Sequence, residues 1–428
     1  MNQRSKLTLI EVISMAVGTM IGASIFSIFG LGAKISGQDL PLAFLLSGVY
    51  AMAVAYSYAI LGSKIISDAG PIAFITKGFG KILITNVLAV LQWLSFVVSI
   101  ALFVKGFAGY FLPFIHVVPT SLNMGLVEAG LIIFFTALNL FGSKAVGRAE
   151  FYIVMIKLSI LLVFILAGFM SINWEHVQPV LDTQHISNIL NGSIIFFLSY
   201  MGFGLITNAS EQIKNPKINI PRSIYISIFI VMLFYVLISL VTLGNLSLPE
   251  IIKAQENALA VAAKPFLGNF GFVLITIGGL FSISSALNAT IYGGANVAYS
   301  LAKDGVLPKT FERKVWFKSP EGLYITAGLG LFLALLFNLE AIATITSLVT
   351  TVIYIFVLLS HLKLYKTYGG KKSIIILNLM ILLFVFISLI KYQWQTQKVS
   401  FYGSIGLFAL GFLGAFIFQK YRQLQKNK

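Results

Sequence analysis

Two glycine-containing interruptions inside long apolar segments place the strongest constraint on how this chain can fold. The first lies at residues 18–26, with the sequence GTMIGASIF, and the second at residues 199–204, with the sequence SYMGFG. A membrane-spanning helix normally satisfies its backbone groups internally, because hydrocarbon offers no water to replace a lost hydrogen bond. Interruptions at corresponding places in two halves of a chain therefore indicate unwound backbone that binds a ligand, as in transporters.

The composition is that of a multi-span membrane protein. Of the 428 residues 58% are apolar and only 10% are charged, and the mean hydropathy is +0.93. A soluble domain has about a quarter of its residues charged. The chain has no cysteine, which excludes disulfides and thiolate sites, and its four histidines lack metal-ligand spacing. We therefore expect no metal and no cofactor.

Spanning segments need about 20 apolar residues each. The sequence predicts twelve of them, near 8–34, 39–62, 82–112, 123–142, 151–171, 187–211, 222–244, 266–300, 323–338, 342–362, 373–391 and 402–420. We expect an all-α integral membrane protein with one domain, 1–428. Because the interrupted segments are the first and the sixth, residues 8–171 and 187–362 are predicted to form two inverted repeats, with 373–420 as two additional helices. The segments near 82–112 and 266–300 are over-long, which indicates tilt or short extensions.

The net charge of +16 follows from the orientation of these segments. An even number of spans puts both termini on one side of the membrane. If that side is the cytoplasm, most of the lysine and arginine residues lie there, as the positive-inside rule requires. We therefore expect a multi-pass protein of the cytoplasmic membrane with both termini in the cytoplasm, in contact with the lipid bilayer, and we expect no nucleic-acid partner. The charge does not predict the oligomeric state.

The first interruption offers two kinds of polar backbone group. A helix that restarts near Ser24 presents free N–H groups and a positive dipole end, which suit a carboxylate. A helix that ends near Met20 leaves carbonyls without helical partners, which suit an ammonium group. The same argument applies from Leu198 to Met201. Together these groups suit an α-amino acid, although glycines in membranes also serve simply to let helices pack closely.

Lys157 lies about a third of the way along the fifth segment. A lysine at that depth costs about 3 kcal/mol or more, and by default it marks a functional site. Burial favours the uncharged amine, so the side chain could exchange a proton. It could also act as a tethered cation where a sodium ion would otherwise bind. Alternatively, it extends to the nearby membrane surface, since Arg148 is only a few turns away.

Other mechanisms find no support in the sequence. We see no phosphate-binding loop with a lysine and no Ser-His-Asp set, so neither ATP-driven transport nor an enzyme is expected.

Three motifs resemble the amino acid–polyamine–organocation (APC) superfamily of secondary transporters. The first is residues 18–26. The second is residues 196–203, FFLSYMGF, followed by Glu211, Lys214-Asn215-Pro216 and Ile220-Pro221-Arg222. The third is residues 299–308, YSLAKDGVLP. The motifs occur in the same order as in the family and cover most of the first ten segments.

The resemblance implies five-plus-five inverted repeats with discontinuous first and sixth helices, and a substrate between helices one, three, six, eight and ten. It also implies roles for individual residues. By position, Gly22, Ala23 and Ser24 match the carboxylate-binding turn, Met20, Leu198 and Met201 match carbonyls that bind the amino group, Phe197 and Phe203 match an aromatic lid and pocket, and Lys157 matches the lysine of proton-coupled and sodium-independent members.

Gly204 departs from the family pattern, because many members have glutamate there. A carboxylate at this position would suit proton coupling or a cationic substrate, so its absence weakens both inferences for the position. The resulting Gly-Phe-Gly also resembles the sixth helix of neurotransmitter:sodium symporters, which share the fold. Lys157 argues against sodium at the equivalent place.

The expected function is that of a secondary active amino acid transporter that works by alternating access. Proton-coupled uptake of neutral L-amino acids is favoured over obligate exchange by an antiporter. A polyamine or organic-cation transporter would need carboxylates near the interruptions. A sensor that binds amino acids without moving them would usually need an output domain, and the short termini offer none.

Overall fold

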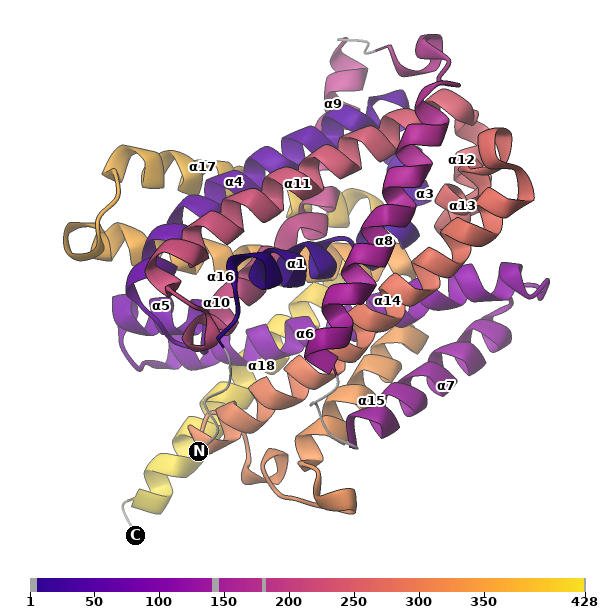
Figure 1. Ribbon diagram of the computed structural model, residues 1–428. Coiled ribbons are helices and arrows are strands. Elements are labelled where there is room, and N and C mark those ends of the chain that lie inside the picture. The colour runs from indigo at the N-terminus through magenta and orange to yellow at the C-terminus, as the bar shows by residue number, and fades with distance from the viewer. Residues whose placement is uncertain (1–5, 141–145, 179–181, 427–428) are drawn as a thin grey trace.

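The computed structural model describes residues 6–140, 146–178 and 182–426. Nearly all of this part is helical (Figure 1), and apart from two isolated bridges it contains no β-structure. Eleven of its helical segments are long and apolar enough to cross a membrane. The expectation of an all-α, multi-pass membrane protein is therefore confirmed.

The first segment is broken where the sequence predicts. Helix α1 spans Leu9–Met20, and a capping box formed by Thr8 and Glu11 satisfies its first N–H groups. Helix α2 restarts at once and spans Ala23–Ser27, and α3 follows at Phe29–Ser36. The chain is thus non-helical at Ile21 and Gly22, between two stretches of helix.

The sixth segment is interrupted in a different way. Helix α9 spans Thr183–Phe196, and the next eight residues form a 3₁₀ helix, η4, at Phe197–Gly204. Only a short α-helical turn follows, α10 at Leu205–Asn208. A run of 3₁₀ helix this long is uncommon because its hydrogen bonds have poorer geometry. The second interruption is therefore a change of helix type.

Most of the other long helices agree with the predicted segments. They are α4 (Leu40–Lys64), α6 (Leu83–Phe114), α7 (Ser121–Leu140), α8 (Val146–Phe169), α11 (Pro216–Asn245), α14 (Lys264–Lys303), α16 (Leu339–Tyr368), α17 (Lys372–Thr396) and α18 (Lys398–Lys426). Short helices connect them: α5 (Pro71–Phe79), α12 (Leu248–Ala254) and α13 (Ala258–Ala262), with 3₁₀ turns η1 (Gly37–Asp39), η3 (Trp174–Val177), η5 (Ser210–Gln212), η6 (Gln255–Asn257), η7 (Lys309–Phe311) and η8 (Trp316–Lys318).

Two predicted segments take a form that the sequence did not specify. The ninth, expected at 323–338, is the 16-residue helix α15 (Glu321–Leu336), which is about 24 Å long and shorter than a typical span. The over-long eighth is α14, which is kinked at Gly268, where φ is +61°. The count of twelve spans and the inverted repeat stay predictions.

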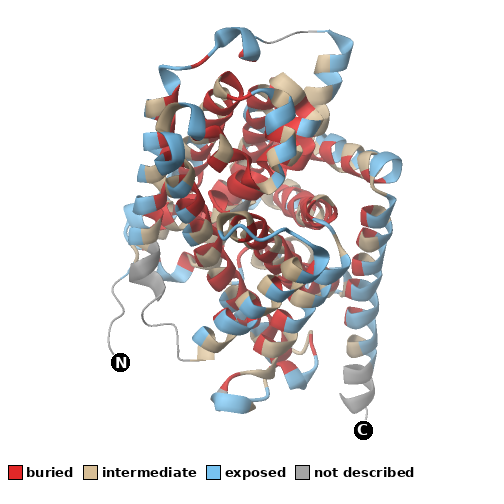
Figure 2. Ribbon diagram, turned by 90° about the vertical axis from the view of Figure 1, so that its right-hand side faces the viewer, coloured by how far each residue is buried: buried red, intermediate tan, exposed pale blue. Residues whose placement is uncertain are grey.

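Helix α6 lies at the centre of the bundle. In its most apolar window 83% of the residues are buried, against 17% for α7 and 22% for α18, which lie at the periphery. Helices α4 and α11 run side by side and α1 lies against α11, while α14 packs along α6 (Figure 1). Figure 2 shows the buried residues concentrated in this interior. Exposed apolar side chains on α7, such as Leu126 and Ile133, face outward as lipid contacts require.

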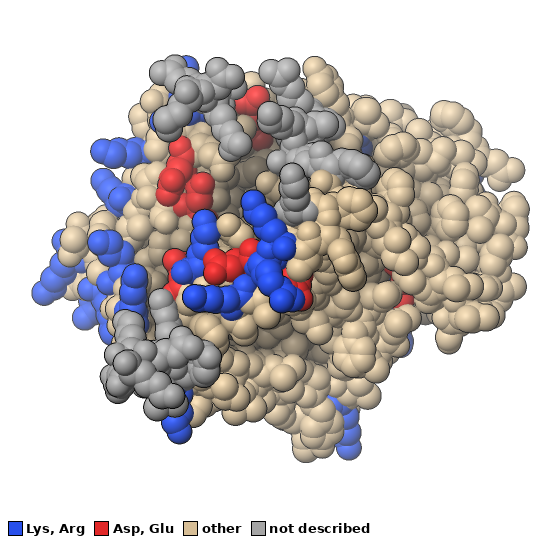
Figure 3. All heavy atoms as spheres, turned by 90° about the horizontal axis from the view of Figure 1, so that it is seen from below, with Lys and Arg blue, Asp and Glu red and all other residues tan. Residues whose placement is uncertain are grey.

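Exposed basic residues gather at one end of the bundle, which we call the basic face. Figure 3 shows lysine and arginine side chains collected on one part of the view. These residues lie at the ends of α4, α14 and α16, on α5, and around the starts of α6, α11, α15 and α17. They are Lys64, Lys77, Lys81, Lys214, Lys217, Arg222, Lys303, Lys309, Arg313, Lys314, Lys366, Lys371 and Lys372. The other end, which carries η1, η6 and the end of α6, is called the opposite face.

Candidate functional site

The two interrupted segments touch each other in the middle of the bundle. A Cβ atom added to Gly202 would lie only 2.9 Å from the backbone N and the Cγ of Met20. Any side chain at position 202 would push the two segments apart, so this glycine is required by a close backbone approach. The interruptions that the sequence places about 180 residues apart thus form one structural feature.

Side chains from three other helices bind the carbonyls of the first interruption. The Lys157 ammonium group on α8 donates to the Gly18 carbonyl. The Tyr235 hydroxyl on α11 donates to the Met20 carbonyl over 2.5 Å. On α14, the Ser282 hydroxyl donates to the Ile21 carbonyl over 2.9 Å. Polar backbone that leaves a helix inside a membrane protein needs such partners, because lipid supplies none.

The second interruption is held in the same manner. Its Ser199 carbonyl accepts from the Tyr235 hydroxyl over 3.2 Å, and its Met201 carbonyl accepts from the Tyr354 hydroxyl on α16 over 3.1 Å. The Tyr354 ring also stacks on Phe203, with 5.7 Å between ring centroids. Tyrosine hydroxyls therefore take part in fixing both unwound segments.

Lys157 is the only lysine or arginine with a fully buried side chain among the residues whose burial the structure describes. Its exposed fraction is 1%, and its amine lies at the end of α1 instead of reaching the membrane surface. A hydrogen bond from a charged donor is roughly twice as strong as a neutral one. The protonation state of this amine therefore affects how firmly the first interruption is held.

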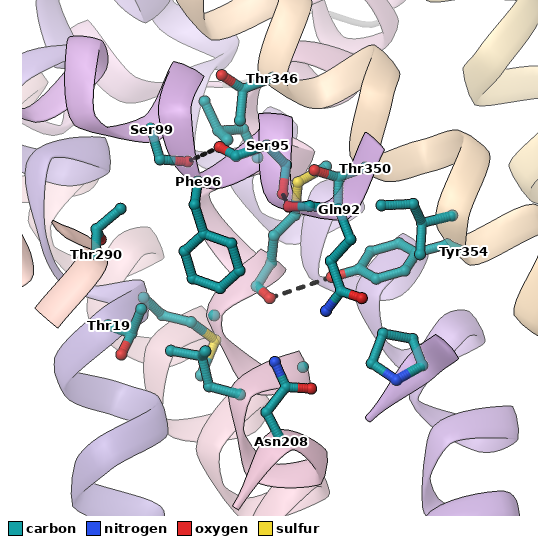
Figure 4. Close-up of a pocket in the computed structure, with 18 of the residues that line it drawn as sticks. Thr19, Gln92, Ser95, Phe96, Ser99, Asn208, Thr290, Thr346, Thr350 and Tyr354 are labelled. Atoms are coloured by element: carbon teal, nitrogen blue, oxygen red, sulfur yellow. Dashed lines mark hydrogen bonds between the residues drawn. The ribbon is translucent and has the colours of Figure 1, made fainter. Parts of the chain in front are cut away.

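A cavity of about 160 Å³ lies beside the two interruptions (Figure 4). It is bounded by Thr19 and Met20 of α1, by η4, and by residues of α6 and α16. Its polar side chains include Gln92, Ser95, Ser99, Asn208, Thr290, Thr346 and Thr350, and Gln92 and Asn208 both project into the space in Figure 4. None of the described residues that line the cavity carries a charge.

The cavity extends from the interruptions toward the basic face. Its wall there includes Tyr58 in the last third of α4, which ends at Lys64, Pro71 at the start of α5, and Leu205 and Asn208 of the short helix α10. Toward the opposite face the interruptions are covered by fully buried aromatic residues, among them Phe26 and Phe196. The space beside the interruptions is therefore one-sided.

The structure separates the predicted substrate-binding residues into groups. Met20, Leu198 and Met201 line the cavity. Gly22 precedes α2 and is buried, and a Cβ there would meet Ala286 at 3.3 Å and Phe103 at 3.5 Å. Ala23 and Ser24 form the first turn of α2, but their side chains lie outside the described part of the structure.

Phe197 and Phe203 are fully buried and are not among the residues that line the cavity. Both pack against the Tyr354 ring, with ring centroids 5.9 and 5.7 Å away. Gly204, by contrast, lines the cavity, and a Cβ there would have room, with its nearest neighbours 3.9 Å away on Tyr58 and Tyr354. The carboxylate that many family members place at this position would therefore reach the cavity.

Sequence reasoning missed the hydroxyl groups that hold the interruptions, namely those of Tyr235, Ser282 and Tyr354. Each lies in an apolar segment without any accompanying motif, and the chain has 17 tyrosines. Their polar hydroxyl groups within spanning segments indicate that each needs a hydrogen-bond partner. The sequence does not indicate which group that partner is.

Comparison with known proteins identifies the family. A family model described as amino acid permease matches residues 7–413. The chain belongs to this family and to the APC superfamily.

Individual relatives agree with this assignment. An uncharacterized protein of Methanocaldococcus jannaschii, MJ0609, is 60% identical over 99% of this chain and 97% of its own length. The inner membrane transport protein YbaT of Escherichia coli is 30% identical over 98% of this chain and 97% of its own length. The branched-chain amino acid permease BcaP of Lactococcus lactis is 24% identical, with 85% and 82% covered. This chain is thus a transporter of the amino acid permease family and not an enzyme.

Proposed function

We propose that this permease takes up neutral L-amino acids across the cytoplasmic membrane by alternating access and that proton transfer at Lys157 drives the uptake. Both termini lie in the cytoplasm in this proposal, and residues 8–171 and 187–362 form the two inverted repeats. The observation that carries the proposal is a buried lysine bound to the first interruption, next to a cavity whose described lining residues carry no charge.

The backbone of the interruptions supplies the contacts for the two charges of an amino acid. The substrate carboxylate lies near Gly22, Ala23 and Ser24, where α2 begins. Its ammonium group lies at the carbonyls of Met20, Leu198 and Met201. The Met201 carbonyl oxygen has two lone pairs and accepts from the Tyr354 hydroxyl. The Met20 carbonyl accepts from both the Gly22 N–H, over 3.0 Å, and the Tyr235 hydroxyl, so the ammonium group would replace one of these donors there.

The charge of the cavity favours a neutral substrate side chain. A cationic side chain in a low-dielectric site needs a carboxylate beside it. Gly204 stands where that carboxylate would enter the cavity, and the other described lining residues are uncharged. BcaP, a relative named for branched-chain amino acids, is consistent with a neutral substrate, and a polyamine is disfavoured for the same reason as a cationic amino acid.

Lys157 couples this binding to protons through the first interruption. The protonated amine donates a charge-assisted hydrogen bond to the Gly18 carbonyl, and the neutral amine binds the same carbonyl more weakly. Loss of the proton therefore weakens one of the hydrogen bonds that hold the end of α1 and makes movement relative to α8 easier. The two protonation states then favour different conformations of the transporter.

Uptake into proteoliposomes tests the proposal. We expect labelled neutral amino acids to accumulate when the outside is made acidic, and an uncoupler to abolish the accumulation. Uptake that requires an internal amino acid and ignores the uncoupler would instead identify an exchanger. A preference for lysine, arginine or polyamines would contradict the neutral substrate class.

Replacement of Lys157 tests the role of the amine. Lys157→Ala should abolish proton-driven accumulation, with uptake at least about tenfold lower at the optimal pH, since it removes a charge-assisted bond and the titrating group. The matched control replaces the ion pair Lys105–Glu128, whose atoms are 3.2 Å apart, by Lys105→Met together with Glu128→Gln. We expect this control to keep its response to the proton gradient, and an unchanged response in Lys157→Ala would refute proton coupling through this residue.

A further inference from the structure

The connection between α14 and α15 contains a small hairpin on the basic face, at residues 313–321. The Val315 N–H donates to the Ser319 carbonyl over 3.0 Å and closes the hairpin. The 3₁₀ turn η8 then places Trp316 and Phe317 at its tip. These two residues are 72% and 77% exposed. The hairpin therefore presents two large aromatic side chains away from the protein interior.

Hydrogen bonds and packing hold the hairpin in one shape. The Glu321 N–H donates to the Arg313 carbonyl over 2.8 Å, and the two side chains form an ion pair at 2.8 Å. The Tyr324 hydroxyl on α15 donates over 3.0 Å to the Trp316 carbonyl, and the two rings meet edge to face with centroids 5.5 Å apart. Phe317 has a φ of +54°, which costs free energy for a bulky residue. The exposed tip is thus maintained against a backbone cost.

The hairpin adjoins the lipid-facing surface of the bundle. It leads directly into α15, which exposes Leu329, Phe332 and Leu335, and in Figure 1 the loop projects beyond the end of this helix. Helix α15 is about 24 Å long, whereas the hydrocarbon layer is about 30 Å thick. Residues that flank a short span are drawn into the membrane interface. The aromatic tip therefore lies at the level of the lipid headgroups.

Basic side chains accompany the aromatic tip. Residues 309–317 contain three basic residues and one acidic residue, Glu312. Lys309 and Lys314 are exposed, while Arg313 is engaged by its ion pair within the hairpin. Aromatic rings favour the membrane–water boundary, and lysine side chains near the surface attract anionic lipids. The combination matches the chemistry of an anionic phospholipid.

We propose that residues 309–317 bind an anionic phospholipid of the surrounding bilayer. Trp316 and Phe317 insert at the hydrocarbon boundary, and Lys309 and Lys314 contact the phosphate. This contact anchors the basic end of the short helix α15. The described residues that line the cavity beside the interruptions include none of residues 309–317, so the lipid site is separate from the substrate site and does not depend on which substrate is carried.

The depth of the tip tests its insertion. Phe317→Cys gives the chain its only cysteine, which can carry a nitroxide label in vesicles of phosphatidylglycerol and phosphatidylcholine. We expect this label to collide more with oxygen, which concentrates in the bilayer, than with a water-soluble nickel chelate. Lys371→Cys, in the exposed connection between α16 and α17 on the same face, is the control and should favour the chelate. If both labels favour the chelate equally, the tip lies in water as a surface for a soluble partner, and the proposal is wrong.

Lipid selectivity tests the headgroup contact. Thermal unfolding of the purified protein in neutral detergent is followed while phosphatidylglycerol or phosphatidylcholine is added. Lys309→Gln with Lys314→Gln removes two charges from the site, and the control, Lys371→Gln with Lys372→Gln, removes two exposed charges elsewhere on the basic face. We expect the first pair to raise the phosphatidylglycerol concentration needed for half of the thermal shift by about tenfold or more, and the control pair by less than about threefold. Phosphatidylcholine should affect all three proteins alike.

The outcomes separate a lipid site from the general charge of the basic face. Equal losses in the two double variants would mean that phosphatidylglycerol responds only to overall charge, which refutes a site at residues 309–317. A phosphatidylglycerol response that neither pair changes would refute it as well. The substituted residues do not line the cavity, so a failure of this inference leaves the proposed transport function untouched.

Discussion

The two sides of the interruptions are built differently. Toward the basic face lies the cavity, lined by hydroxyl and amide side chains. Toward the opposite face, aromatic rings pack in close pairs, such as Phe44 with Phe196 at 4.2 Å and Phe26 with Tyr110 at 6.1 Å between centroids. One side leaves space for a polar ligand, and the other is filled.

Glycines allow the filled side to pack so closely. A Cβ at Gly32 of α3 would lie 1.8 Å from the Phe196 ring of α9, and one at Gly30 would lie 2.3 Å from the Gln255 carbonyl oxygen of η6. These contacts join α3 to α9 and to η6. The difference between the two sides indicates a state with the opposite face closed. Under the alternating access proposed above, these glycine contacts would have to separate.

The largest effect is expected from Gly32→Ala. The added methyl group overlaps Phe196, which cannot yield because its ring is fully buried against Phe44. Overpacking of this kind costs about 1–3 kcal/mol, so the closed state should be depopulated and transport reduced by about tenfold.

Cysteine labelling measures this change, because the chain contains no cysteine of its own. Ser27→Cys places a thiol at a buried position on the filled side. We expect it to react faster with an impermeant maleimide in the Gly32→Ala background. Gly328→Ala is the control, since a Cβ at that position meets no atom within 4 Å. Equal labelling in both backgrounds would mean that the α3–α9 contact does not control access.

An intermediate effect is expected from Asp39→Asn. The buried Asp39 carboxylate is 2.5 Å from His185 Nδ1 at the start of α9, so this pair joins η1 to α9 on the opposite face. The amide of Asp39→Asn forms a weaker hydrogen bond to His185 than the carboxylate does. Because the Asp39 side chain is buried, this loss should cost about 1–3 kcal/mol of stability. Thermal melting should fall by several degrees, and Ser27→Cys labelling should increase.

The exposed ion pair Arg313–Glu321 on the basic face provides the comparison for Asp39→Asn. Its atoms are 2.8 Å apart, but the arginine side chain is 63% exposed. Arg313→Gln should therefore change stability by less than about 0.5 kcal/mol and leave labelling unaltered. If Arg313→Gln lowered stability and raised Ser27→Cys labelling more than Asp39→Asn does, the opposite face could not be assigned as the closed side.

The sequence identified the interrupted backbone of the candidate site, but it did not identify which side chains bind the carbonyls of that backbone. Gly22 and the run around Gly202 mark the interruptions because glycine in an apolar segment is a local signal. Lys157 was recognisable as a candidate site residue, but its bond to Gly18 joins residues 139 positions apart, and the Tyr235 bond to Met20 spans 215 positions. Such contacts depend on how helices rotate and pack against one another, which local patterns do not determine.

The same limit applies to the fold. Segment existence followed from hydropathy, whereas the short α15 and the kink at Gly268 depend on packing and on a positive φ. Phe197 and Phe203 were expected from the family pattern to cover or line the pocket. Their positions behind Tyr354 could not be read from that pattern, because Tyr354 comes from a helix far along the chain.

The smallest expected effect concerns Glu256 in η6, on the filled side. Burial raises the pKa of this carboxyl group, and the positive charge of Lys105 partly offsets the rise. A Cβ at Gly109 of α6 would lie 2.7 Å from the Glu256 side chain, so the loop packs directly on the central helix. A carboxyl whose pKa is raised in the closed state favours that state while it is protonated, and this stabilisation is lost as the pH rises through the raised pKa.

Ser27→Cys labelling should therefore increase by up to a fewfold from acidic to neutral pH, since a carboxyl with different pKa values in the closed and open states changes their balance with pH. Glu256→Gln, which keeps the packing and removes the titration, should flatten this pH dependence. If the pH dependence persists in Glu256→Gln, another group titrates. Lys157→Ala in the same labelling assay would then show whether that group is Lys157 at the first interruption. If neither variant changes the profile, a titrating group other than Glu256 and Lys157 sets the pH dependence of closure.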